Sequence, residues 1–207
     1  MPANLSRLVL RGAAGFLVAL AVWLALSEPY TRLLASLSES VTRLTESPPI
    51  TRVVPSGTLM ILHRTDLPPS PAELQLALES GDITFNFILL ATLFAAGSRA
   101  FSDRNVFGFV AAAALLLLVH VLAVVSFIKA DYALNYGSWS AAHYGAVARS
   151  IWSAAPYFYS VVGVHAFAFA LWWLFRAPAA PAPAVSSGSR RAALPRARGS
   201  SRWKKTA

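Results

Sequence analysis

The sequence predicts an all-α membrane protein with four transmembrane helices and a small extracytoplasmic β-element between helices 1 and 2. Three observations support this fold class: a hydrophobic share of 56%, a charged share of only 13%, and four long apolar segments. Soluble domains carry about 45–50% apolar and about 25% charged residues. The excess of apolar side chains therefore indicates that lipid, rather than water, surrounds much of the chain.

Each apolar segment approaches the length that a bilayer requires, because a hydrocarbon core about 30 Å thick takes about 20 helical residues. The segments are residues 8–27, 83–101, 106–128 and 155–175. The second is the shortest, since its continuous apolar run ends at Gly97. It reaches the required length only if Arg99 extends its aliphatic stem back to the headgroups.

The distribution of basic residues predicts the orientation of these helices, because basic residues near short loops are retained in the cytoplasm. With a cytoplasmic N-terminus and four crossings, most of the 18 basic residues lie inside. They are Arg7, Arg11, Arg99, Arg104, Arg176, Arg190, Arg191, Arg196, Arg198, Arg202, Lys204 and Lys205. We therefore expect both termini in the cytoplasm. An alternative for residues 1–28 is a cleaved signal peptide, with "ALS" before Glu28 as the cleavage site.

The first external segment, residues 29–82, combines a helical part with strand-like runs. Leu33, Leu34, Leu37, Val41 and Leu44 recur at the spacing of one helix face, so this part continues the first helix or lies on the membrane surface. "PSG" at 55–57 is a turn signal between strand-like runs, and residues 73–79 alternate with period two. We expect two or three short strands, which pack on the helix ends or on a partner.

The remaining two segments differ from each other in composition. The external loop within residues 83–176, residues 129–154, is rich in Tyr and Trp, as interfacial segments are. It predicts an anchoring interfacial helix or, alternatively, a binding lip that uses His143 and Arg149. Residues 177–207 are rich in Pro, Ala, Ser and Arg and predict a disordered basic tail whose charge sets the membrane topology or, alternatively, binds anionic lipid. A run of charge alone does not indicate nucleic-acid binding.

Two histidines lie within the predicted spans, His120 in the third and His165 in the fourth. At 1.5 Å per residue, the antiparallel helices place both imidazoles at similar depth. Two neutral imidazoles facing each other are the axial ligands of a bis-histidine haem b, so a haem-binding electron-transfer protein is one interpretation. Interhelical hydrogen bonds are the other.

Enzymatic signatures are missing from the sequence, which favours a non-catalytic protein. The chain has no Cys, which excludes disulfides, thiolate metal sites and cysteine nucleophiles. It contains no G-x-S-x-G, no H-E-x-x-H and no phosphate-binding or dinucleotide fingerprint. No acidic residue lies inside a predicted span, which argues against a proton-coupled carrier.

The order of features resembles a family of small membrane proteins encoded beside exosortases, the membrane enzymes that process C-terminal sorting signals of exported bacterial proteins. The resemblance rests on the N-terminal span, on "SGTLMILHRTDLPPSPAELQLALESG" (56–81), and on "DITFNFILLATLFAA" (82–96) followed by two more spans. It covers residues 8–176. The exosortase itself uses a Cys nucleophile, so this chain is not that enzyme.

What the resemblance implies is an accessory or scaffold role in protein sorting in the bacterial inner membrane, with a sorting enzyme as the partner. An exposed strand edge can take up a partner strand, which gives this hypothesis a physical route. The docking surface would combine the β-element with the polar start of the second span. Its candidate residues are Arg64, Asp82, Thr84 and Asn86.

Overall fold

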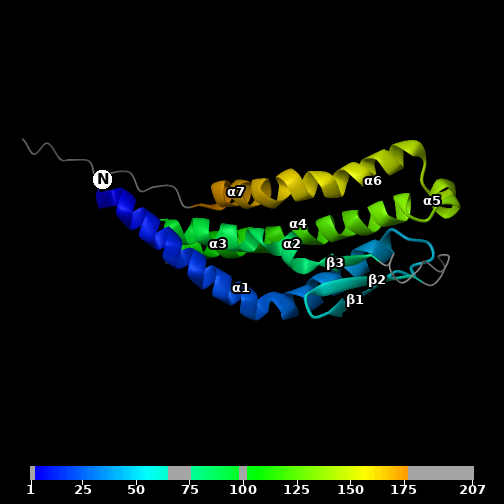
Figure 1. Cartoon of the computed structure of the whole chain (residues 1–207). Helices are drawn as coiled ribbons and strands as arrows, with labels where there is room; N and C mark the ends of the chain where they lie inside the picture. The colour runs from blue at the N-terminus through cyan, green and yellow to red at the C-terminus, as the bar shows by residue number, and fades with distance from the viewer. Residues whose placement is uncertain (1–2, 65–75, 98–101, 177–207) are drawn as a thin grey trace, which may run out of the picture. The chain divides into compact units, whose positions relative to one another are not determined.

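The computed structural model describes residues 3–64, 76–97 and 102–176, and its elements are almost all helical (Figure 1). The predicted disordered tail, residues 177–207, lies outside the described residues. Described helices are α1 (Ala3–Leu44), α2 (Ser80–Thr84), α3 (Asn86–Ala96), α4 (Asp103–Leu134), α5 (Ser138–His143), α6 (Ala146–Phe158), the π-helical turn η2 (Tyr159–Gly163) and α7 (Val164–Phe175). Described strands are β1 (Arg52–Ser56), β2 (Leu59–His63) and β3 (Ala77–Glu79).

Three helical stretches are long and apolar enough to cross a membrane, which supports the predicted membrane class. They are Val9–Leu44 in α1, Asp103–Leu134 in α4, and the continuous Ala146–Phe175 formed by α6, η2 and α7. The predicted second span corresponds to the shorter apolar stretch Ser80–Ala96, divided between α2 and α3. Residues 98–101, which the prediction needed for full length, lie outside the described residues.

Helix α1 runs without a break through the predicted boundary at residues 28 and 29. Its 42 residues rise about 63 Å at 1.5 Å per residue, more than a bilayer core requires. Pro29 lies inside the helix and lacks a backbone donor. Hydroxyls nearby bond to the preceding turn, since Thr31 Oγ1 donates to the carbonyl of Ser27 at 2.8 Å. The segment after residue 28 therefore continues the first helix, one of the two predicted alternatives.

The predicted β-element is a three-stranded antiparallel sheet in the order β1-β2-β3. Gly57, with φ of +61°, takes the first position of the two-residue turn between β1 and β2, where a type II′ hairpin requires glycine. Val53, Met60 and Leu62 point to one face and are buried. They share a core with Leu34 and Ala35 of α1, so the sheet packs directly on the first helix.

The helices pack closely through small residues, as membrane helices do. A methyl group added at Gly15 of α1 would lie 2.5 Å from Cβ of Ala95 in α3. At Gly108 of α4 it would lie 2.5 Å from the carbonyl oxygen of Phe175 in α7. Helix α3 contacts both α1 and α7, while α4 contacts α1, α6 and α7. In Figure 1, α6 and α7 run alongside α4, and α1 lies obliquely to them.

The ends of α1 and α4 at Leu44 and Leu134 lie next to the sheet and α5, and we call this part of the molecule the sheet end (Figure 1). The predicted aromatic loop 129–154 is mostly helical here: it contains the last turn of α4, all of α5 and the start of α6. Tyr132, Tyr136 and Trp139 form an edge-to-face ring cluster that joins α4 to α5.

Candidate functional site

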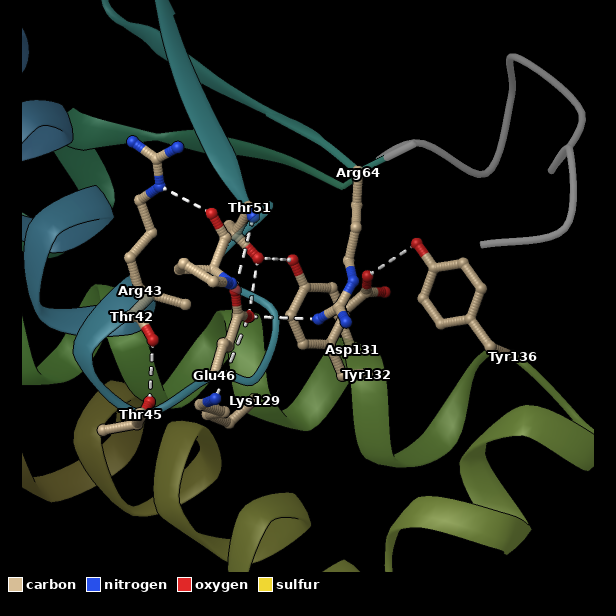
Figure 2. Close-up of polar contacts among 11 residues, drawn as sticks. Thr42, Arg43, Thr45, Glu46, Thr51, Arg64, Lys129, Asp131, Tyr132 and Tyr136 are labelled. Atoms are coloured by element: carbon tan, nitrogen blue, oxygen red, sulfur yellow. Dashed lines mark hydrogen bonds and ion pairs between the residues drawn. The ribbon is translucent and has the colours of Figure 1, made fainter. Parts of the chain in front are cut away.

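A cluster of charged and hydroxyl side chains occupies the sheet end, where α1, the sheet, α4 and α5 meet (Figure 2). Its centre is Glu46, just after α1, whose side chain is only 4% exposed. One carboxylate oxygen, Oε1, lies 3.1 Å from Nη1 of Arg64 and 3.9 Å from Nζ of Lys129. A single carboxylate therefore faces two buried cations.

Thr51 extends the cluster from Glu46 to α4. Its hydroxyl donates to Glu46 Oε1 at 2.6 Å and its backbone N–H donates to Oε2 at 3.3 Å. Since the Thr51 hydroxyl proton is used, the Tyr132 hydroxyl donates to Thr51 Oγ1, at 2.6 Å. This chain of bonds joins the start of β1 to α4.

Arg64, directly after β2, is held by charge and by aromatic rings. Its side chain is 8% exposed, and its guanidinium carbon lies 4.7 Å from the Tyr132 ring centre and 5.0 Å from that of Trp139. Arginine over an aromatic face gains about 0.5–2 kcal/mol, more when water is excluded. Arg64 therefore fixes the end of β2 against α4 and α5.

Tyr136, next to this cluster, keeps its proton and acts as a hydrogen-bond donor. Tyr136 Oη donates to Asp131 Oδ2 at 3.1 Å, and Asn135 Nδ2 donates to Asp131 Oδ1 at 2.7 Å. Burial, together with the Asp131 carboxylate, raises the pKa of Tyr136 well above its ordinary value. Burial also raises the pKa of Tyr144.

A pocket of about 350 Å³ opens beside this cluster. Its lining comes from four parts of the chain: Glu46, Arg64, Lys129, and the aromatic residues Trp139, Tyr144 and Trp152. His143 also lines the pocket and stacks on Trp139, with ring centres 4.2 Å apart. The predicted binding lip thus contains His143, whereas Arg149 is exposed on α6 and is not among the lining residues.

The second polar site is His120, which is completely buried between α1, α3 and α4. Its Nε2 lies 2.7 Å from Asn86 Oδ1, and its Nδ1 lies 2.7 Å from the hydroxyl of Tyr30. Because an amide oxygen can only accept, Nε2 carries the proton and Nδ1 accepts from Tyr30. His120 is therefore a neutral link between three helices.

His165 lies elsewhere, on the exposed face of α7, where it lines an apolar pocket of about 330 Å³ with Asn86, Phe16 and Phe169. A haem iron would need a free nitrogen on each ring, and both nitrogens of His120 are hydrogen-bonded. His120 could ligate iron only after losing Tyr30 or Asn86. The residues as placed do not fit the bis-histidine interpretation, which stays a prediction.

The four predicted partner-binding residues do not share one surface. Asp82 is exposed on α2. Thr84 and Asn86 are buried: Thr84 accepts from Trp23 Nε1 at 3.3 Å, and Asn86 contacts His120. Arg64 belongs to the cluster at the sheet end. Only Asp82 of the four is exposed to a partner.

Sequence reasoning did not identify Glu46, Thr51, Lys129 and Tyr132 as a site. One signal was available for part of it, because Lys129 and Asp131 are charges that directly follow the apolar run 106–128 on the same helix. Within residues 3–64, 76–97 and 102–176, no three His, Asp or Glu side chains are grouped so as to hold a metal ion.

Comparison of the chain with models of protein families, with curated proteins and with solved structures gave no match. The functional conclusions below therefore come from the chain's own sequence and geometry.

Proposed function

We propose that this chain is a non-catalytic accessory or scaffold protein of a bacterial inner membrane, which presents its small sheet to a membrane partner such as an exosortase-type sorting enzyme. In this proposal the chain crosses the membrane four times, with α2 and α3 forming the second crossing. Both termini lie in the cytoplasm and the sheet end lies outside. The distribution of basic residues supports this orientation.

The outer face of the sheet is the observation that carries the proposal. Val54 of β1, Ile61 of β2 and Ala77 of β3 are paired across the three strands and form an apolar stripe on the face opposite the core. Val54 is 43% exposed, and Leu59 on the same face is 39% exposed. Exposed apolar side chains that are contiguous, rather than scattered, are typical of interaction surfaces.

The anchoring of the sheet supports the same conclusion. Arg64 at the end of β2 and Thr51 before β1 both contact Glu46, and Thr51 also contacts Tyr132 of α4. Because the sheet is fixed to two membrane helices, its outer face is held in place before a partner arrives. A preorganised surface loses less conformational entropy on binding.

A photocrosslinking experiment in native membranes tests this proposal. The photoreactive residue is placed at Val54 or Ile61 on the outer face, and at Met60, which is 1% exposed on the inner face, as the matched control. We expect Val54 and Ile61 to trap the same membrane protein, identified by mass spectrometry, and Met60 to trap none.

A negative crosslinking result would contradict the proposed function. If Val54 and Ile61 give no crosslink while the full-length protein is folded in the membrane, the sheet is not a docking surface and the proposed function is wrong. If the trapped protein is not a sorting enzyme, the scaffold role stands and the exosortase assignment falls.

A further inference from the structure

Lys129 is a residue at the sheet end whose bonding is incomplete among the described residues. Its side chain is 9% exposed, yet its ammonium group has three donors and makes no hydrogen bond to another described residue. Within the same described part of the chain, the nearest carboxylate oxygen is Glu46 Oε1, which is 3.9 Å away and beyond hydrogen-bond range. A buried ammonium in this state is costly unless another acceptor completes it.

The charge of the pocket favours an anion as that acceptor. Among the described residues, the cations Arg64 and Lys129 line it, together with the carboxylate of Glu46. The carboxylate of Asp131 is not among these lining residues and is held by Asn135 and Tyr136. An anionic group placed beside Lys129 would accept hydrogen bonds from its ammonium group.

The position of the pocket along α4 favours a lipid as the carrier of that anion. Lys129 directly follows the apolar run 106–128, so the ammonium lies where the hydrocarbon core of a bilayer ends. Trp139, Tyr144 and Trp152 line the pocket at the same level, and Trp and Tyr are enriched at headgroup depth. Val147 and Ile151 are exposed on α6, the helix that carries the lining residue Trp152, and offer an apolar surface to an acyl chain.

From these observations we propose that the pocket at the sheet end binds the phosphate of an anionic phospholipid through Lys129, with Arg64 and the aromatic wall completing the site. This proposal goes beyond the docking function and does not depend on it, since the pocket and the outer face of the sheet are different surfaces. The lipid would act as a structural ligand that ties α4, α5 and the turn after α1 together.

Native mass spectrometry of the full-length protein, released from detergent micelles, tests this site. The probes are dioleoyl phosphatidylglycerol, dioleoyl phosphatidylcholine and inorganic phosphate. We expect one phosphatidylglycerol per chain, retained about tenfold more tightly than phosphatidylcholine, because a hydrogen bond to a charged group contributes at least about 1.4 kcal/mol. Inorganic phosphate should not compete at millimolar concentration.

Two variants and one control locate the site. Lys129→Met keeps the aliphatic length and should weaken phosphatidylglycerol binding about tenfold. His143→Glu adds a negative charge on an exposed lining residue that stacks on Trp139, and it should weaken phosphatidylglycerol binding as well. Arg149→Met removes an exposed cation of α6 outside the pocket and should leave binding unchanged.

Several outcomes would overturn the proposal. They are equal binding of the two lipids, unchanged binding by both Lys129→Met and His143→Glu, displacement by inorganic phosphate, which would indicate a soluble anion, or failure of any lipid to remain bound. Loss of binding only in Arg149→Met would move the lipid to the outer face of α6 and would also contradict it. None of these results bears on the crosslinking test.

Discussion

The sheet end and the middle of the helical bundle are held together by different chemistry. At the sheet end, one carboxylate, two cations and a chain of hydroxyls are buried together. In the middle, the polar contacts join neutral groups, such as the chain from Tyr30 through His120 to Asn86, set among closely packed small residues. The difference follows from the surroundings, because charge is tolerated where water is near and is expensive in hydrocarbon.

The largest loss in the free energy of unfolding is expected for substitution of Glu46 at the sheet end. Glu46→Gln keeps the shape but removes the carboxylate that faces Arg64 and Lys129, and breaking a buried ion pair costs about 3–5 kcal/mol. The matched control is Glu28→Gln, whose ion pair with Arg32 is exposed and should contribute less than about 1 kcal/mol. Equilibrium unfolding in mixed detergent and dodecyl sulfate micelles measures both. Equal losses of stability would show that the network at the sheet end is not a special anchor.

The second-largest loss of stability is expected from substitution where α1 and α3 are closest. Gly15→Ala places a methyl group 2.5 Å from Ala95 Cβ and should destabilise the protein by about 1–3 kcal/mol. Gly12→Ala is the control, because its added methyl would meet Ala96 at an ordinary 4.0 Å. The double variant Gly15→Ala with Ala95→Gly should recover most of the loss in the same unfolding experiment. An unaffected single variant would mean that the two helices are not so closely packed.

A smaller loss of stability is expected from substitution of His120 in the middle of the bundle. His120→Leu leaves the Tyr30 hydroxyl and Asn86 Oδ1 without their partner, which should cost about 1–2 kcal/mol. His165→Leu, on an exposed face, should change the free energy of unfolding by less than about 0.5 kcal/mol. The protein and both variants are also expressed with a haem supply, and their absorbance spectra are recorded. A Soret band that both substitutions abolish would restore the bis-histidine interpretation.

The sequence predicts the parts of this fold that depend on local patterns. The turn at 55–57 and the alternation near residue 78 predict the sheet, and Gly57 has the positive φ that the turn requires. Three of the four apolar segments are long helices. The fourth, Ser80–Ala96, is shorter and is divided at Phe85 between α2 and α3.

The candidate site was less predictable, for two physical reasons. Glu46, Arg64 and Lys129 are far apart in the chain, and nothing local indicates that a hairpin would bring them together. For the histidines, residue spacing gives depth but not rotation about the helix axis. His120 and His165 were therefore expected at similar depth, but no pattern showed that one would face Tyr30 and Asn86 while the other faced outward.

The continuity of α1 has a consequence for how any partner approaches. The part of α1 after Ser27 is 17 residues of unbroken helix to Leu44, about 25 Å of rigid rise. A sheet joined to the membrane by a flexible linker could sample many positions, whereas this sheet packs on a rigid helix. In the proposed docking role, this rigid helix holds the outer face of the sheet at a fixed distance from the membrane, which favours partners whose own contact surface reaches that distance.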